Sequence, residues 1–184
     1  MGKNIILIGF MGTGKSTIGQ RLARRLGMVF VDTDREIEAL TGMTVAEIFR
    51  KHGEKRFRSE EKLLARKLAQ KEGLVISCGG GMPLDPDNMR VLGANGVIIG
   101  LKAAPQDVFR RVMKKRRRRP LLARDLTIEG LQAMMAEREP YYQCAHITVD
   151  TSVDGIEEVV NKIILSLKEL CHDQSQRESR NEEL

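Results

Sequence analysis

Residues 9–16 form a glycine-rich run that ends in a lysine and a serine. They read GFMGTGKS, which fits the pattern G-x-x-x-x-G-K-[ST]. Glycines let backbone N–H groups converge on phosphate oxygens at the positive end of a following helix. We expect Lys15 to reach the β- and γ-phosphates and the Ser16 hydroxyl to bind Mg²⁺. The pattern therefore predicts that the chain binds a nucleoside triphosphate.

Two carboxylates, Asp32 and Asp34, follow the second apolar run of the chain. On an extended backbone, side chains at i and i+2 point the same way, so both are expected to line the crevice at the carboxyl ends of the strands. A carboxylate near Ser16 holds magnesium through water, and one slightly further out accepts a proton from an attacking hydroxyl. The alternative is that the two aspartates cap the next helix, and one of them can do both.

Three further positions have the chemistry to bind an anionic acceptor. Arg58 and Glu61 are i, i+3 neighbours, so Glu61 can orient a guanidinium that binds a carboxylate through two hydrogen bonds. Residues 79–81 are three glycines that let a ligand approach the backbone closely. Arg138 ends a helical stretch and is a second candidate anion clamp. The alternatives are a surface ion pair, a flexible connection to Pro83 and a solvated helix-end charge, respectively.

Short apolar runs alternate with amphipathic stretches along the chain. The helical stretches show apolar residues at helical spacing, as at Ile18, Leu22 and Leu26 and in a longer stripe that begins at Ile156. Most of the apolar runs are continuous, which predicts strands that are covered on both faces. They span residues 4–8, 28–31, 74–78, 97–101 and 147–149. The alternation predicts an α/β fold with a parallel sheet between layers of helices.

Two internal segments and the C-terminal end interrupt this alternation. Residues 34–71 contain helical pieces without a strand, which predicts an inserted subdomain. Residues 114–125 begin with six consecutive cations and contain Pro120, which predicts a mobile loop. Residues 172–184 are polar and lack an apolar stripe. We therefore expect one domain over residues 1–171, followed by a disordered tail.

Composition and charge exclude several classes of protein. The 184 residues suit one compact domain, and no apolar run approaches the roughly 20 residues of a membrane span. Three widely spaced cysteines indicate neither a zinc site nor a disulfide framework, and they favour a reducing cytoplasm. The net charge of +6 and the basic run raise the alternative of RNA binding. No phenylalanine or tyrosine interleaves with that run, so we expect no nucleic-acid partner.

Six motifs, in order, resemble those of the shikimate kinase family over about residues 3–165. They are GFMGTGKST (9–17), DTD (32–34), FRSEE (57–61), GGG (79–81), RPLL (119–122) and EREPYY (137–142). The resemblance implies a three-layer P-loop NTPase fold, with a five-stranded parallel sheet flanked by helices. It also implies a substrate-binding insertion at about residues 34–71 and a lid at about residues 112–125. The implied activity is transfer of the γ-phosphate of ATP to the 3-hydroxyl of shikimate, in chorismate and aromatic amino acid biosynthesis.

The resemblance also implies roles for individual residues. Asp34 would orient or deprotonate the hydroxyl, while Lys15 and Arg119 would stabilise the transferring group. Mg²⁺ would be bound by Ser16 and, through water, by Asp32. The residues expected to bind shikimate are Asp34, Arg58, Gly80 and Arg138. Those expected to bind ATP are Gly12, Thr13, Gly14, Lys15, Ser16, Thr17 and Arg119.

Several points stay open at this stage. The adenine contacts fall either to Arg110 or to Arg111, with the segment 151–154 as a candidate for the other side of the base. We expect a monomer. A kinase for another small metabolite, such as gluconate, shares the phosphate loop, but that alternative leaves the two arginines, the DTD motif and the glycine run without a common purpose.

Overall fold

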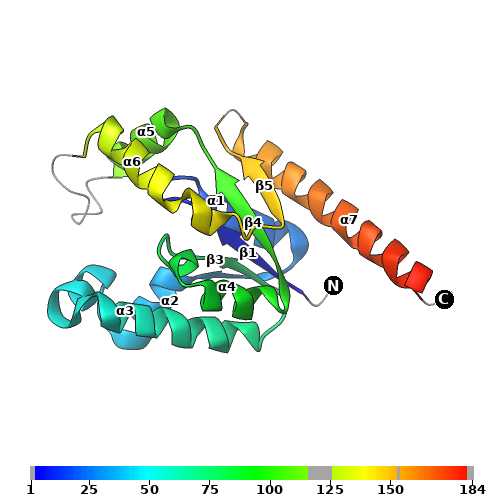
Figure 1. Ribbon diagram of the computed structural model, residues 1–184, viewed down its shortest axis with the longest axis horizontal. Helices are drawn as coiled ribbons and strands as arrows, with labels where there is room; N and C mark the ends of the chain where they lie inside the picture. Colours follow the sequence, from blue (N-terminus) through cyan, green and yellow to red (C-terminus); the bar gives the residue numbers. More distant parts are fainter. Residues whose placement is uncertain (1–2, 116–125, 153, 182–184) are drawn as a thin grey trace.

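A five-stranded parallel sheet forms the centre of the computed structural model, which describes residues 3–115, 126–152 and 154–181 (Figure 1). The strands lie in the order β2-β3-β1-β4-β5, and every neighbouring pair is parallel. Their bounds are β1 Asn4–Ile8, β2 Val29–Asp32, β3 Leu74–Ser77, β4 Gly96–Lys102 and β5 Ile147–Asp150. The α/β fold and the five strands are therefore confirmed.

Helices cover both faces of this sheet. Alternate side chains of β1 enter two separate cores, with Ile5 and Leu7 on one face and Ile6 and Ile8 on the other. The first core contains residues of α1 and α7, and the second contains residues of α2, α3, α4, α5 and α6. The helices are α1 Lys15–Leu26, α2 Thr33–Thr41, α3 Val45–Ala69, α4 Pro86–Gly93, α5 Pro105–Lys115, α6 Ile128–Arg138 and α7 Ile156–Asn181, with short 3-10 turns η1 Met82–Leu84 and η3 Glu139–Tyr142.

Burial differs between the central and the edge strands. All residues of β1 and β3 are buried, as expected for strands covered on both faces. The expectation is wrong for the edge strand β2, where Val29 is 63% exposed and the other three residues are only half-buried. β2 pairs with a neighbour on one side alone, so its outer margin is open to solvent.

The segment between β2 and β3 contains only helices, α2 and α3. Thr44 and Glu47 form a capping box at the start of α3. Gly53, with φ of 77°, kinks α3, so that its second half packs beside α4 (Figure 1). This second half carries Phe57 and Leu64 into the core under the sheet, which fixes the position of the intervening Arg58.

The C-terminal end differs from the expected disordered tail. The backbone of residues 172–181 is helical and continues α7, whose end extends beyond the sheet (Figure 1). Glutamate, glutamine and arginine favour helix, and extending a helix that is already formed needs no new nucleation. Among the described residues, no helix is long and apolar enough to cross a membrane. Most of the proposed lid, including Arg119 in residues 116–125, lies outside the described residues.

Candidate active site

The glycine-rich run follows β1 and leads directly into α1. Gly9, Gly12 and Gly14 have φ of 140°, 83° and 100°, a region that other residues rarely enter. A Cβ on Gly9 would lie 2.3 Å from the carbonyl oxygen of Leu101, so only glycine fits there. Gly14 is the N-cap of α1, which places the loop at the positive end of that helix. The local structure is therefore the phosphate loop that the sequence predicts.

The ammonium group of Lys15 lies inside this loop. Its Nζ atom donates hydrogen bonds to the carbonyl oxygens of Gly9, at 2.7 Å, and Phe10, at 3.0 Å, and the residue is only 9% exposed. These contacts place the positive charge of Lys15 inside the glycine-rich loop, where phosphate oxygens bind. Thr17, in the same first turn of α1, is exposed.

Ser16 and Asp32 are in direct contact. The Ser16 hydroxyl donates a 2.7 Å hydrogen bond to Oδ2 of Asp32. The hydroxyl oxygen of Ser77 lies 3.5 Å from that of Ser16. Asp32 is also the N-cap of α2, because its Oδ1 accepts from the backbone N–H of Arg35. The expectation that Asp32 and Asp34 lie two residues apart on an extended backbone is therefore wrong. Because α2 begins at Thr33, Asp34 lies in the first turn of a helix.

The glycine run after β3 is approached by two side chains from distant segments. A Cβ on Gly79 would lie 2.1 Å from Oδ1 of Asp34, and a Cβ on Gly81 would lie 2.1 Å from Nη1 of Arg58. Neither glycine has a positive φ, so the space around them, and not backbone strain, requires the missing side chain. The protein's own carboxylate and guanidinium therefore occupy the positions beside Gly79 and Gly81, and ligand binding at this run stays a prediction.

Arg58 is held by two carboxylates of its own helix. Its Nη1 donates to Glu61 Oε2 at 2.7 Å, and its Nη2 donates to Glu54 Oε1 at 2.7 Å. Glu61 is 1% exposed, which excludes the alternative of a surface ion pair. Burial, with a smaller contribution from the charge of nearby Asp34, raises the pKa of Glu61 to about 7 against the lowering effect of the Arg58 hydrogen bond and charge.

Arg138 connects the glycine run to the phosphate loop. Its Cζ atom lies 5.8 Å from the centre of the Phe10 ring, and its Nη1 donates to the carbonyl oxygen of Gly80 at 3.5 Å. Tyr142 is buried nearby, and burial raises the pKa of its phenol against the opposing effect of the Arg138 charge. Arg138 is therefore not a solvated helix-end charge, because it lies between Phe10 and Gly80.

Comparisons with known proteins agree with this arrangement. Residues 11–168 match the family model described as Shikimate kinase. A shikimate kinase of Pelotomaculum thermopropionicum is 55% identical over 167 residues, which are 91% of this chain and 96% of that protein. The chain belongs to the shikimate kinase family. As a member, it is an ATP-dependent kinase.

Solved structures support the same family. The structure of shikimate kinase from Acinetobacter baumannii in complex with shikimate superposes with a TM-score of 0.84 at 32% identity, covering 92% of this chain and 94% of that one. A gluconokinase from Sinorhizobium meliloti, at 18% identity and a TM-score of 0.62, shares the fold. The resemblance inferred from six short motifs is thus confirmed over residues 11–168.

Arg110 and Arg111 are the two candidates for contact with the adenine base, and their surroundings differ. Arg110 is exposed and pairs with Asp107 one turn earlier on α5. Arg111 is half-buried and donates to the Thr151 carbonyl oxygen at 2.6 Å and to its Oγ1 at 3.1 Å. The structure therefore brings Arg111 and the start of the segment 151–154 together beside the phosphate loop.

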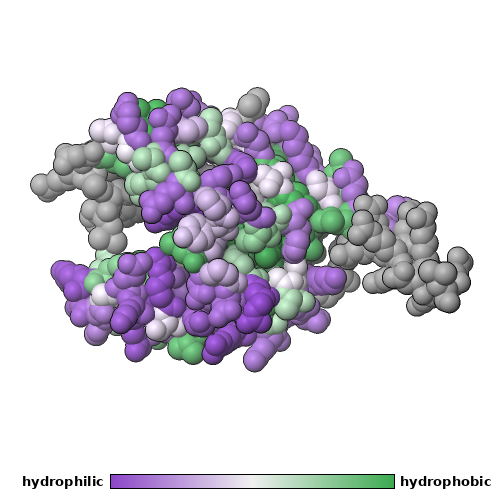
Figure 2. Space-filling view, in the orientation of Figure 1, coloured by the Kyte–Doolittle hydropathy of each residue, from purple (hydrophilic) through white to green (hydrophobic). Residues whose placement is uncertain are grey.

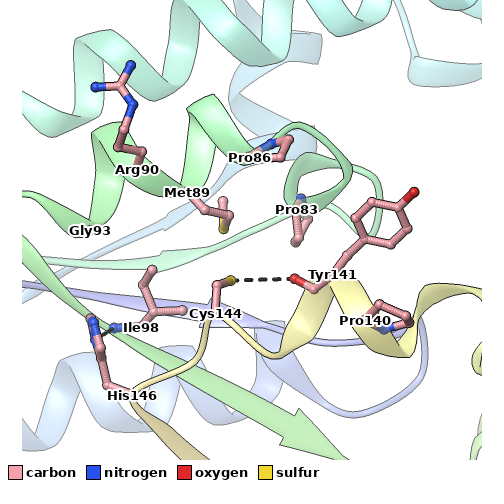
Figure 3. Close-up of a pocket in the computed structure, with 10 residues that line it drawn as sticks. All are labelled: Pro83, Pro86, Met89, Arg90, Gly93, Ile98, Pro140, Tyr141, Cys144 and His146. Atoms are coloured by element: carbon pink, nitrogen blue, oxygen red, sulfur yellow. Dashed lines mark hydrogen bonds between the residues drawn. The ribbon is translucent and has the colours of Figure 1, made fainter.

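A cavity of about 510 Å³ lies next to this site but contains none of the predicted site residues (Figure 3). Pro83 and Pro140, on its wall, follow the glycine run and Arg138 by two residues each. The cavity is lined by Pro83, Pro86, Met89, Arg90, Gly93, Ile98, Pro140, Tyr141, Cys144 and His146. Its wall is mostly apolar and carries no carboxylate, so it lacks the chemistry of phosphoryl transfer.

Proposed function

We propose that this chain transfers the γ-phosphate of ATP to the 3-hydroxyl of shikimate, a step of chorismate synthesis. The observation that carries the proposal is the position of Arg138, which contacts Phe10 of the phosphate loop and Gly80 of the glycine run. A guanidinium there lies at the border between the phosphate site and the residues assigned to the acceptor. Arg58, beside Gly81, supplies a second donor for the acceptor carboxylate.

The reaction needs charge stabilisation and positioning more than covalent chemistry. Lys15 offers a buried positive charge to the transferring group, and we assign the same task to Arg119. Asp34 would orient the acceptor hydroxyl and accept its proton as the phosphate is transferred in line. Cys78 lies behind this site, and burial raises the pKa of its thiol, which opposes formation of a nucleophilic thiolate.

The donor atoms present fit Mg²⁺, which prefers hard oxygen ligands and keeps several waters. Ser16 Oγ and Asp32 Oδ2 lie 2.7 Å apart at the start of α1, so the hydroxyl would bind the ion directly and the carboxylate would bind it through water. When bound, the ion neutralises charge on the phosphates. Among the described residues no cluster of three His, Cys, Asp or Glu side chains could hold a metal, so the nucleotide itself would supply further ligands.

The division of the chain into working parts is also part of the proposal. Residues 1–171 would form one kinase domain, with the helices of residues 34–71 binding the acceptor and residues 112–125 closing over the nucleotide. Hydrophilic side chains cover much of the face drawn in Figure 2, including the outer surface of α3. We propose a cytoplasmic monomer that binds small molecules and no nucleic acid.

A substrate panel tests this function. ADP release is measured with ATP and Mg²⁺ in the presence of shikimate, gluconate or a single-stranded RNA, with Lys15→Ala as the inactive control. Of the three additions, we expect only shikimate to support turnover. Lys15→Ala should abolish that turnover, because the positive charge of Lys15 is needed most in the transition state. Rapid turnover with gluconate and none with shikimate would assign the site to another acceptor. Tight, salt-dependent RNA binding without turnover would indicate a binding protein instead.

A further inference from the structure

Thr151 is a buried residue that links β5 to the phosphate loop. It follows the last residue of β5, is 3% exposed, and donates its backbone N–H to the carbonyl oxygen of Lys102 at 2.8 Å. Its Oγ1 lies 3.0 Å from the carbonyl oxygen of Thr13 and 3.1 Å from that of Lys102. None of the roles assigned above uses this side chain.

Arg111 completes the same network from α5. Its two terminal nitrogens donate to Oγ1 and to the carbonyl oxygen of Thr151, and Nη1 also lies 3.5 Å from the carbonyl oxygen of Gly12. A Cβ on Gly12 would lie 3.0 Å from Val112 Cγ2 and 3.3 Å from Val108 Cγ1, so α5 packs tightly against the loop here. The loop carbonyls at positions 12 and 13 therefore face protein donors on two neighbouring elements.

The donor capacity of the Thr151 hydroxyl is fully used within the protein. Its single proton is shared between the carbonyl oxygens of Thr13 and Lys102, and its oxygen accepts from Arg111. No donor remains for the phosphate oxygens of a bound nucleotide, so any influence of this hydroxyl on the phosphates is transmitted through the loop.

The direction of one loop peptide follows from this contact. A trans peptide is planar, and its N–H points opposite to its carbonyl. Because the Thr13 carbonyl faces Thr151, the N–H of Gly14 points to the other side of the loop. A phosphate loop binds its anion through such N–H groups, and each peptide turned the wrong way presents a carbonyl oxygen to the phosphates.

We propose that Thr151 is a positioning residue for nucleotide binding, whose hydroxyl, together with Arg111, fixes the Thr13–Gly14 peptide with its N–H toward the triphosphate. The inference rests on the proposed ATP-dependent transfer and deepens it. It assigns a task to the strand end at β5, far along the chain from the glycine-rich run.

The test compares two substitutions at this one position. Thr151→Val keeps the branched shape without the hydroxyl, and Thr151→Ser keeps the hydroxyl. We expect Thr151→Val to raise the KM for ATP by about 5- to 20-fold, since a buried carbonyl loses its donor, while the KM for shikimate stays within about twofold. Thr151→Ser should restore the KM for ATP to within about twofold.

A matched control distinguishes positioning from general stability. Thr148→Val makes the same substitution on the exposed side of β5 and should change neither KM. A purely structural role would lower the melting temperature and damage both KM values and kcat together, and that result would overturn the proposal. Thr151→Ala removes the hydroxyl without pressing a methyl group on the two carbonyls, so it serves if Thr151→Val does not fold, with the same expected result.

Direct binding of the ATP analogue AMP-PNP separates this inference from the proposed function. If Thr151→Val weakens AMP-PNP binding and Thr151→Ser does not, the positioning role stands even where the wild type shows no turnover with shikimate. If the wild type phosphorylates shikimate and Thr151→Val binds AMP-PNP as tightly as the wild type does, the positioning role is wrong and the function stands.

Discussion

Arg58 has two carboxylate partners, one buried and one exposed. Only the exposed carboxylate can give way to a ligand at little cost in free energy, because water solvates it after it leaves the arginine. Glu61 holds the guanidinium from within the core, whereas Glu54 lies at the surface with its side chain 63% exposed. An acceptor carboxylate can therefore replace Glu54 while Glu61 keeps the guanidinium in place. The group proposed to bind the acceptor carboxylate is thus Arg58, whose position is fixed by the buried Glu61.

Arg58→Ala should weaken binding of the acceptor and leave binding of the nucleotide nearly unchanged. We expect the KM for shikimate to rise about 30- to 100-fold, because a charge-assisted hydrogen-bonding pair is lost, with the KM for ATP within about twofold. Steady-state kinetics measures both constants. The control is Arg56→Ala, which removes an exposed arginine two residues away. An unchanged KM for shikimate in Arg58→Ala would show that the carboxylate binds elsewhere.

Glu61 should make the stability of the protein fall as pH rises. Its pKa is about 7 in the folded protein against 4.5 in the unfolded chain, so the folded state binds the extra proton between these values. Its contribution is complete below the unfolded pKa and is lost as pH rises through the folded one. We expect urea unfolding to show a wild-type free energy that drops, relative to Glu61→Gln, by about 2 kcal/mol between about pH 5.5 and 8.

The matched control for this measurement is Glu72→Gln, which changes an exposed glutamate between α3 and β3. Its free energy of unfolding should run parallel to that of the wild type over the same pH range. A difference between wild type and Glu61→Gln that stays constant with pH would show that Glu61 is ionised throughout.

At the scale of elements, the glycine run after β3 gives α2 and α3 room to approach. Gly79→Ala places a methyl group against Asp34, and Gly81→Ala places one against Arg58. We expect Gly79→Ala to lower kcat by about 100-fold and Gly81→Ala to raise the KM for shikimate by about tenfold, because these side chains must move away. Gly80→Ala, whose Cβ would lie 3.8 Å from the nearest atom of Arg138, should cost less than either.

Kinetics and thermal melting of these variants test the close approach. Gly130→Ala, in α6, is the control for adding a methyl group where its Cβ meets only Thr127 Oγ1, at 3.4 Å. Because the displaced groups are side-chain ends, the melting temperatures should change little. Wild-type kinetics in both Gly79→Ala and Gly81→Ala would mean that neither approach matters for the reaction.

Local patterns predicted the elements well and the contacts between them poorly. The apolar runs located all five strands to within one or two residues. For β1 and β3 the reason is burial on both faces, whereas the edge strands β2 and β5 are partly exposed, which the same apolar runs did not predict. The reasoning about Asp34 was wrong because it placed Asp34 on an extended backbone before the helix, whereas α2 already begins at Thr33. The roles of Gly79 and Gly81 were missed because the side chains beside them come from residues more than 20 positions earlier, which no local pattern records. The burial of Glu61 and the buried position of Thr151 were likewise set by packing between elements.

At the scale of the whole molecule, the packed part of α7 and its projecting end should behave differently. Val159, Val160 and Ile163 lie in the core with α1, whereas residues 172–181 continue beyond the sheet (Figure 1). Removing residues 172–184 should change the melting temperature by less than about 2 °C and leave kcat/KM unchanged. Ile163→Ala should lower the free energy of unfolding by about 2 to 4 kcal/mol. A large loss of activity on truncation would place the domain boundary further along the chain.

The position of the phosphate on the product tests the central claim most directly, because it depends on the phosphate loop, the two arginines and Asp34 acting in one pocket. Shikimate is incubated with ATP, Mg²⁺ and the full chain, and phosphorus–proton correlated NMR locates the new phosphate ester. The account predicts a single product that carries the phosphate on the 3-hydroxyl. A phosphate on another hydroxyl, or inorganic phosphate alone, would contradict it.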